Sequence, residues 1–161
     1  MTAKRKTPAT RAALVLKEHG MPFSLHTYAY EDKGGTRTAA EALGVDEHRV
    51  IKTLVMENDR GEPFLVLMHG DRTVSTKALA RALKVKAVTP CTPERANRHT
   101  GYLVGGISPF GTRKALKVYV EESILSLPNL YINAGKRGLL ARLRPEDLRT
   151  ILQPSPVNAA R

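Results

Sequence analysis

The sequence predicts an α+β fold in one domain with a mixed or antiparallel sheet, and three observations carry this prediction. The chain has 161 residues, the usual size of one compact domain. Short segments that alternate apolar and polar residues are interspersed with segments whose apolar residues recur every three to four positions. No repeat recurs along the chain and no linker divides the predicted strands into two groups, so we expect a single domain.

Five segments have the pattern of β-strands. Residues 49–57 and 63–69 flank the sequence Asn-Asp-Arg-Gly, a composition typical of a hairpin turn. Residues 22–28 alternate between two chemically different faces, as a strand does. Two further strands are predicted at residues 116–120 and 129–133.

Five segments carry helix-start signals, at Thr7–Pro8, Thr38, Ser75, Thr92–Pro93 and Pro145. The first helix is expected to end at Gly20, the second at Gly44 and the fourth near Gly101. Beyond these elements, we expect residues 1–7 to form a flexible N-terminus and residues 153–161 to form a flexible tail.

The composition excludes several classes of protein. Hydrophobic residues make up 42% and charged residues 25% of the chain, which is ordinary for a folded domain and excludes disorder as a whole. The apolar runs are far shorter than the roughly 20 residues that cross a bilayer, and the first residues lack the apolar segment of a secretory signal. The single Cys91 cannot form an internal disulfide, which fits a reducing compartment. We therefore expect a cytoplasmic protein with no membrane partner.

The net charge of +11 is concentrated in one part of the chain. Residues 1–71 hold ten basic and ten acidic side chains, and residues 146–161 hold two of each. The excess lies in residues 72–145, where 14 basic residues accompany three acidic ones. Such a block indicates a polyanionic partner, most often a nucleic acid, because Lys and Arg replace the counterions of phosphates. A solubilising surface is the alternative interpretation.

Lys52 stands out because it lies in a predicted strand whose two faces are both apolar. Val50 and Leu54 share its face, and Ile51 and Val55 lie on the opposite one. A buried ammonium without a partner loses its proton or recruits an anion, so the pattern favours a functional lysine. The alternative is an outward-facing lysine that protects an edge strand from aggregation.

Two glycine-containing segments indicate ligand-binding loops. Residues 101–111 hold four glycines and Pro109, a composition that lets backbone amides approach a ligand, although the spacing matches neither a Walker loop nor a dinucleotide fingerprint. Residues 132–138 end a strand in a basic turn whose amides, with Lys136 and Arg137, could hold a phosphate. The alternatives are a wide structural turn and a solvated hairpin turn, respectively.

The residues give no strong signal of a metal centre or of a protein nucleophile. The five histidines include no pair at the spacing of metal ligands on a helix, so we expect no metal and no cofactor. Ser75 and Ser108 do not lie in a nucleophile elbow, although a triad dispersed through the sequence stays open. Cys91 has no histidine nearby in the sequence and is better interpreted as part of a helix start.

Four motifs, taken in order, resemble the YbaK/EbsC family of aminoacyl-tRNA editing proteins, which is related to the editing domain of prolyl-tRNA synthetase. The motifs are FSLHTY from Phe23, VIKTL from Val50, GYLVGGISPFG from Gly101 and AGKRG from Ala134. The resemblance covers residues 8–152, which we expect to form the editing domain. It implies a mixed, partly closed sheet surrounded by helices.

The resemblance also implies roles for individual residues. Lys52 matches the essential lysine of the family, which would hold the terminal adenosine or phosphate of the substrate and position the ester. Tyr28 would line the pocket, with Thr53 among the substrate-binding residues, and Lys136 and Arg137 would contact phosphates of the tRNA. The loop that would hold the aminoacyl carbonyl through its backbone comprises Gly105, Gly106, Ile107, Ser108 and Pro109. Leu140 stands where some relatives carry a polar residue, so any polar contribution there is in doubt.

The reaction that the resemblance implies is the removal of cysteine from Cys-tRNA(Pro), and also from Cys-tRNA(Cys). In cysteine-specific members the thiol of the substrate attacks its own carbonyl and releases a cyclic thiolactone, which requires no protein nucleophile. The expected partners are tRNA and prolyl-tRNA synthetase. Two alternatives are a non-catalytic tRNA-binding or synthetase-associated module, and an editing enzyme for another small amino acid such as alanine, for which relatives use a hydroxyl of the terminal ribose.

Overall fold

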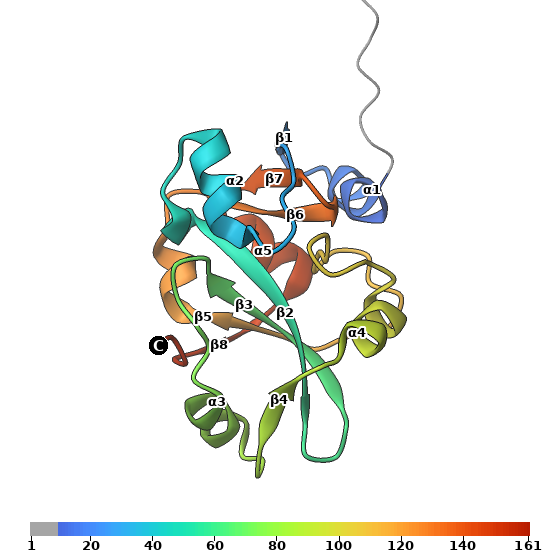
Figure 1. Cartoon of the computed structure of the whole chain (residues 1–161), viewed down its shortest axis with the longest axis vertical. Coiled ribbons are helices and arrows are strands. Elements are labelled where there is room, and N and C mark those ends of the chain that lie inside the picture. Colours follow the sequence, from blue (N-terminus) through green and yellow to red (C-terminus); the bar gives the residue numbers. More distant parts are fainter. Residues whose placement is uncertain (1–9) are drawn as a thin grey trace, which may run out of the picture.

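Strand β2 (Val50–Asn58) runs diagonally through the molecule in the computed structural model, which describes residues 10–161 (Figure 1). It forms an antiparallel hairpin with β3 (Pro63–His69), as the turn composition predicts. On its other side, β2 pairs in parallel with β6 (Leu130–Lys136) at one end and antiparallel with β4 (Val88–Pro90) at the other. β2 is therefore an interior strand of the sheet near both of its ends.

The remaining strands extend the sheet on both sides of the β2–β3 hairpin. β7 (Leu139–Leu143) pairs antiparallel with β6, and β1 (Ser24–Thr27) pairs antiparallel with β7. β5 (Val118–Glu121) runs parallel to β3, and β8 (Ser155–Val157) runs parallel to β5. The eight strands of the described residues form one mixed sheet in the order β1-β7-β6-β2-β3-β5-β8, with β4 beside β2. The predicted fold class is confirmed.

Five α-helices and two short 3-10 helices pack around the sheet in the described part of the chain. They are α1 (Arg11–Glu18), α2 (Gly35–Leu43), η1 (Glu47–Arg49), α3 (Thr76–Leu83), α4 (Pro93–Thr100), η2 (Glu122–Ser126) and α5 (Pro145–Leu152). Ser75 and Thr92 cap α3 and α4 as predicted, because each hydroxyl accepts a hydrogen bond from the backbone amide three residues on. None of the described helices is long and apolar enough to span a membrane.

Two helix starts differ from the prediction. α1 has its N-cap at Thr10, whose hydroxyl accepts a hydrogen bond from the Ala13 amide at 3.1 Å. The predicted start at Thr7, and the flexible residues 1–7, lie outside the described residues. α2 begins before Thr38, whose hydroxyl donates to Glu31 at 3.5 Å instead of capping the helix. A Thr-x-x-Glu spacing also occurs inside helices, because residues three positions apart are neighbours there.

The C-terminal residues are packed against the sheet, so the expectation of a flexible tail over residues 153–161 is wrong. β8 adds an edge strand beside β5, and Ala159 is 1% exposed. The buried carboxylate of Glu121 accepts hydrogen bonds from the amides of Ala159 at 2.6 Å and Ala160 at 3.0 Å. The sequence pattern does not indicate β8 because Pro156 lies within it, and proline is tolerated in a strand only at an edge or a bulge.

Both faces of β2 carry buried side chains, as its sequence predicts, although residues 52–54 are only half-buried. Ile51 and Val55 belong to the main hydrophobic cluster, which also includes Leu16 of α1 and Leu148 of α5. On the opposite face, Met56 packs in a second cluster with residues of α3. The strands β4 and β7 are not predicted by the sequence pattern, because β4 has three residues and β7 is buried at all but one position.

We expect Glu121→Ala to lower the free energy of unfolding by about 2 to 3 kcal/mol, because two amides would lose a charged acceptor. Urea unfolding followed by circular dichroism measures this change. Glu122→Ala is the matched control, since the neighbouring Glu122 is exposed. Equal stability of the two variants would show that the C-terminal residues do not depend on Glu121.

Candidate functional site

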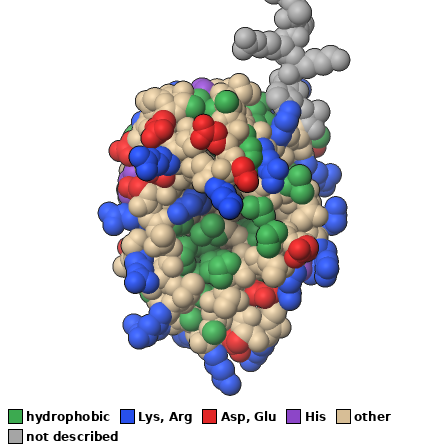
Figure 2. All heavy atoms as spheres, in the orientation of Figure 1, with side chains coloured by type: hydrophobic (Ala, Val, Ile, Leu, Met, Phe, Trp, Pro, Cys, Tyr) green, Lys and Arg blue, Asp and Glu red, His purple; other side chains and the backbone are tan. Residues whose placement is uncertain are grey.

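A gap in the sheet beside β2 opens into a cavity. β6 pairs with β2 at Val50 and Ile51, and β4 pairs with it from Met56 onward, so residues 52–54 have no neighbouring strand on that side. The cavity at this gap has a volume of about 630 Å³, within the range of small-ligand sites. Figure 2 shows a hollow lined by hydrophobic side chains at the centre of this face, with Lys and Arg side chains along its upper rim.

The cavity wall is mostly apolar, with a small set of titratable groups. Apolar side chains in the wall include Ala39, Val50, Leu54, Val74, Ile107 and Leu140. Its titratable side chains are Tyr28, Tyr30, Asp32, Lys33, Lys52 and Cys91. No histidine of residues 10–161 lines the cavity. Such a wall excludes much of the surrounding water and strengthens the interactions of the polar groups that remain.

Thr53 presents its backbone to the gap. The Val55 carbonyl accepts a hydrogen bond from the Cys91 amide at 2.9 Å on this side of β2. Because the pleat of a strand repeats every two residues, the N–H and C=O groups of Thr53 point to the same side. They pair with neither β4 nor β6, and Thr53 Oγ1 also has no partner among the described residues. The gap thus offers a donor and an acceptor to a bound ligand.

Lys52 lies half-buried in the cavity wall, where it donates a hydrogen bond to the backbone carbonyl of Arg72. Burial lowers the pKa of Lys52, while the carboxylates of Glu47 and Asp71 act in the opposite direction. An ammonium group has three N–H donors, so the contact with Arg72 leaves donors for a ligand. The predicted functional lysine therefore sits where a ligand would meet it.

The glycine-rich loop contributes fewer free amides than the resemblance implies. Gly105 and Ile107 line the cavity, and their amides have no acceptor among the described residues. The Gly106 amide is already engaged, because it donates to the carbonyl of Leu103 at 2.8 Å. The part of this loop that can hold a carbonyl is thus limited to two amides that flank Gly106.

Ser108 and Pro109 are buried beneath the loop and do not belong to the cavity wall. Ser108 Oγ accepts a hydrogen bond from the amide of Phe110 at 3.3 Å, and Phe110 is fully buried in the main core. Ser108 therefore helps to fix the shape of the loop, whereas the predicted contact of Ser108 and Pro109 with the substrate stays a prediction.

Asn133 of β6 holds the glycine-rich loop against the β6–β7 turn. Its side-chain nitrogen donates to the carbonyls of Gly105 at 3.2 Å and Lys136 at 3.1 Å. Its side-chain oxygen accepts from the amides of Gly135 at 2.7 Å and Lys136 at 3.2 Å. The amides of Gly135 and Lys136 are therefore not free to hold a phosphate, whereas phosphate binding by the rest of this turn stays a prediction.

Arg137 and Tyr30 complete the contact between loop and turn. Arg137 Nε donates to the carbonyl of Val104 at 2.9 Å, and its guanidinium lies 5.2 Å from the centre of the Tyr30 ring. Only glycine fits at position 106, because a Cβ there would lie 2.8 Å from the backbone nitrogen of Arg137. Lys136 and Arg137 are exposed beside the cavity, and their contact with tRNA phosphates stays a prediction.

Tyr28 lines the cavity, as the resemblance implies, and Tyr30 lines it as well. Burial and the neighbouring Tyr30 raise the pKa of Tyr28, so its hydroxyl stays protonated and can donate a hydrogen bond. Tyr30 was not among the residues predicted from the sequence. Its position two residues after Tyr28 was the available signal, because such residues share a face of an extended segment.

Cys91 also lines the cavity, but its surroundings do not activate it. Burial and the Glu57 carboxylate raise the pKa of its thiol, and Sγ lies 3.9 Å from Glu57 Oε2. The thiolate is the nucleophilic form of cysteine, so a raised pKa makes the thiol less reactive. This environment agrees with the interpretation of Cys91 as a structural residue.

The fold and the cavity define a class of protein. Residues 31–151 match the aminoacyl-tRNA editing domain family, and the chain belongs to this family. The expected class of enzyme, an aminoacyl-tRNA deacylase, is thereby confirmed.

Individual relatives agree with this class. The chain is 32% identical to the "Putative Cys-tRNA(Pro)/Cys-tRNA(Cys) deacylase EbsC" of Enterococcus faecalis over 91% of this chain and 90% of that protein. It is 30% identical to the proline--tRNA ligase of Limosilactobacillus reuteri over 62% of this chain and 18% of the ligase. A crystal structure of "a putative trans-editing enzyme for prolyl tRNA synthetase" superposes with a TM-score of 0.85 at 22% identity, over 98% of this chain and 99% of that chain, and shares the fold.

We expect Asn133→Ala to lower the free energy of unfolding by about 1 kcal/mol, because backbone groups of the loop and the turn would lose their hydrogen-bond partners. Asn133→Asp is the matched variant: it keeps an acceptor for the amides of the turn and loses the donor to Gly105. Urea unfolding and deacylation assays measure both effects. We expect the Asp variant to be the more stable of the two and to lose activity. Wild-type activity in both variants would contradict a role for Asn133 in placing the loop.

Proposed function

We propose that the protein is a trans-editing deacylase that removes cysteine from mischarged Cys-tRNA(Pro), and also from Cys-tRNA(Cys). One observation carries the proposal: the cavity joins the half-buried Lys52 to free backbone groups of β2 and the glycine-rich loop, while no activated nucleophile of the described residues lines it. Such a site can bind and polarise an ester, but the nucleophile must come from the substrate or from water. The name of the Enterococcus faecalis relative supports cysteine as the amino acid removed.

In the proposed reaction, the thiolate of the bound cysteine attacks its own carbonyl carbon. A C–S bond forms, the C–O bond to the ribose breaks, and a four-membered thiolactone leaves while the ribose oxygen takes up a proton. A free cysteine thiol has a pKa of about 8.5, so a fraction is thiolate at neutral pH, and an intramolecular nucleophile has a high effective concentration. Lys52 and the amides of Gly105 and Ile107 would stabilise the oxygen that becomes negative in the tetrahedral intermediate.

The size of the cavity supports binding of the tRNA 3′ end. A volume of about 630 Å³ exceeds that of a cysteinyl group and has room for the terminal nucleoside. Tyr28 and Tyr30 line the same cavity and offer aromatic surface on which a nucleobase can stack. The resemblance also implies that Lys52 positions the ester, and this is the role that the proposed reaction gives it.

Helix α3 is the proposed docking surface for the body of the tRNA. It follows Thr73 and Val74, which line the cavity, so it begins beside the site. Its exposed basic side chains, together with those just after it, are Lys77, Arg81, Lys84 and Lys86. No carboxylate of residues 10–161 lies within ion-pair distance of them. Figure 2 shows Lys and Arg side chains projecting from the lower end of this face, where Figure 1 places α3.

Two alternative functions make different demands on the site. A non-catalytic tRNA-binding module would need the basic surface but no cationic group in a concave apolar wall, so the position of Lys52 favours an enzyme. An alanine-specific enzyme would need a hydroxyl of the terminal ribose as an attacking group, whereas a cysteine-specific enzyme would not. The partial similarity to proline--tRNA ligase supports prolyl-tRNA synthetase as a partner, because both proteins would handle the same tRNA.

We expect wild-type protein to deacylate Cys-tRNA(Pro) and to leave Pro-tRNA(Pro), Ser-tRNA(Pro) and S-methylcysteinyl-tRNA(Pro) intact, because only the free thiol can form the thiolactone. Lys52→Ala should reduce the rate about 100-fold or more, since a preorganised donor to the developing oxyanion is lost. Release of labelled amino acid from each charged tRNA measures both effects.

Lys17→Ala is the control for the loss of one positive charge, because Lys17 is exposed on α1. Removal of the free ribose hydroxyl beside the ester should not slow release of cysteine. Cleavage of Ala-tRNA(Pro) that depends on this hydroxyl would instead identify the protein as an alanine-specific editing enzyme. Full activity of Lys52→Ala would contradict the enzymatic role of the cavity.

We expect the triple variant Arg81→Gln, Lys84→Gln, Lys86→Gln to bind tRNA more weakly and with a slope of log affinity against log salt reduced by about two to three, because three phosphate contacts are removed. The rate at saturating tRNA should change little, since these residues lie outside the cavity wall. Filter binding at several salt concentrations and single-turnover kinetics measure the two quantities. An unchanged salt slope would identify α3 as an ordinary solvated surface.

A further inference from the structure

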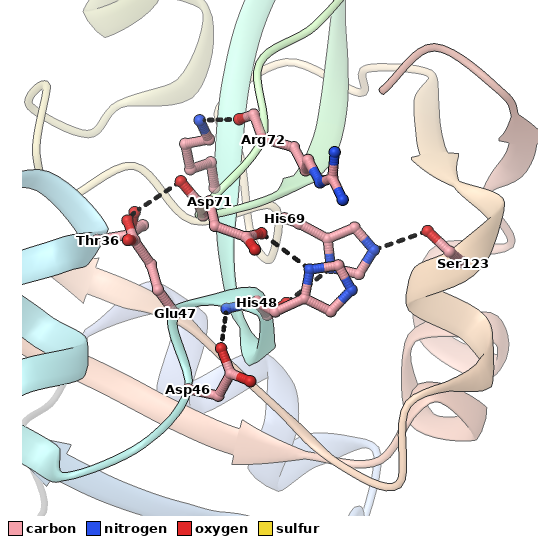
Figure 3. Close-up of polar contacts among 10 residues, drawn as sticks. Thr36, Asp46, Glu47, His48, His69, Asp71, Arg72 and Ser123 are labelled. Atoms are coloured by element: carbon pink, nitrogen blue, oxygen red, sulfur yellow. Dashed lines mark hydrogen bonds and ion pairs between the residues drawn. The ribbon is translucent and has the colours of Figure 1, made fainter. Parts of the chain in front are cut away.

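A cluster of His48, His69 and Asp71 lies next to the segment that contacts Lys52, and the proposed function assigns it no role (Figure 3). These residues come from η1, from the end of β3 and from the turn after β3, and none of them lines the cavity. The cluster could not be predicted from the sequence, because its members do not have the spacing of metal ligands on a helix. The β2–β3 hairpin brings them together by placing the end of β3 beside the start of β2.

Hydrogen bonds and ring stacking hold the three residues of the cluster together. His48 Nδ1 lies 2.8 Å from Asp71 Oδ1, and the rings of His48 and His69 stack with centres 3.6 Å apart and planes 6° from parallel. His69 is 1% exposed, and its two ring nitrogens lie 2.6 Å from the backbone oxygen of His48 and 2.7 Å from Ser123 Oγ. Burial lowers the pKa of His69, so the ring is favoured in its neutral form.

This geometry does not suit a shared metal ion, although two histidines and a carboxylate lie within reach of one another. A metal bound to imidazole lies near the plane of the ring, along the lone pair of a nitrogen. Two parallel rings 3.6 Å apart cannot both direct a lone pair at one ion. Both nitrogens of His69 are also occupied by protein groups. The cluster therefore acts through hydrogen bonds and packing.

The cluster anchors the turn that follows β3. The amide of Arg72 donates to the carbonyl of His69 at 3.1 Å. Gly70 begins the turn, and its carbonyl oxygen lies 3.2 Å from Oγ1 of Thr36 on α2. The same hydroxyl contacts Glu47 Oε2 at 2.8 Å. A Cβ on Gly70 would lie 2.6 Å from the carbonyl oxygen of Val50, so the turn is pressed against the first residue of β2.

We propose that His48 and Asp71, supported by His69, are positioning residues that hold the Arg72 carbonyl where it orients the Lys52 ammonium toward the substrate. An unbroken series of contacts supports this proposal. His48 is hydrogen-bonded to Asp71, Asp71 precedes Arg72 in the chain, and the carbonyl of Arg72 accepts a hydrogen bond from Lys52. Lysine is a flexible side chain, so one fixed acceptor limits the directions of its remaining donors. The proposal rests on the proposed catalytic role of Lys52.

The same turn also brings negative charge toward the ammonium. The carboxylates of Asp71 and Glu47 raise the pKa of Lys52 against the effect of burial. The other titratable side chains at the cavity are Tyr28, Tyr30, Asp32, Lys33 and Cys91. The turn after β3 thus has two effects on Lys52: its carbonyl orients the ammonium, and its carboxylate favours the protonated form.

Asp71→Asn tests the electrostatic effect independently of catalysis. The amide oxygen of the substituted side chain can still accept from His48, but the negative charge is lost, so the pKa of Lys52 should fall. A ¹³C NMR titration of the lysine ε-carbons measures it, with the Lys52 signal assigned by its loss in Lys52→Arg. Glu41→Gln is the control, because Glu41 is exposed on α2 and pairs with Arg37. An unchanged Lys52 titration in Asp71→Asn would overturn this part of the proposal.

His48→Ala tests the positional effect, and it should fold because the side chain is already 36% exposed. We expect kcat for Cys-tRNA(Pro) to fall about tenfold with KM changed less than about twofold, since Lys52 is retained but misdirected. His48→Gln, whose side-chain amide can donate to Asp71, should restore most of kcat. Wild-type kcat in His48→Ala, or equal losses in both variants, would overturn the proposal.

Two further results separate this proposal from others. Stoichiometric binding of Zn²⁺ to the wild type that is lost in His48→Ala, measured by calorimetry, would identify a metal site and overturn the proposal. If the wild type does not deacylate Cys-tRNA(Pro), the proposed function fails, whereas the Lys52 titration in Asp71→Asn still reports on the contact between the turn and the lysine. The two failures are therefore distinguishable.

Discussion

Between its β6 and β4 partners, β2 has a strand neighbour on one side only. Backbone groups at such an edge need hydrogen-bond partners, and inside a folded domain these are supplied by protein, water or a ligand. Here the edge at Thr53 borders a cavity instead of another strand, and the surrounding elements keep it open. The position of the gap also determines which side chains line the site, because the flanking loops meet where the strands diverge.

Two separate sets of contacts keep this cavity in shape. On the β6 side, Asn133 joins the glycine-rich loop to the β6–β7 turn through four hydrogen bonds. On the β3 side, the cluster of His48, His69 and Asp71 holds the turn that contacts Lys52. Both sets are made of neutral or paired groups. The wall between them is mostly apolar, an environment in which the electrostatic interactions of the few charged groups are strong.

Much of the fold was predictable because its signals are local. The β2–β3 hairpin follows from a turn sequence between two apolar segments, and the starts of α3 and α4 follow from Ser75 and Thr92, whose hydroxyls cap the helices. The short buried strands β4 and β7 carry no such signal, because they do not alternate between a wet and a dry face. β8 escaped prediction because the prolines in and just before it resemble a loop, and its place depends on the distant Glu121.

By itself, the sequence determined that Lys52 would lie in a strand with apolar residues on both faces and that residues 101–111 would form a glycine-rich loop, because residue type and spacing specify local conformation. Only the tertiary structure decided which strands flank β2, that a gap between them exposes Thr53, and that the amides of Gly135 and Lys136 donate to Asn133. It also decided that His48 and His69, 21 positions apart, form one stack. These features depend on which distant segments meet, and side-chain pattern along one chain does not encode such pairings directly.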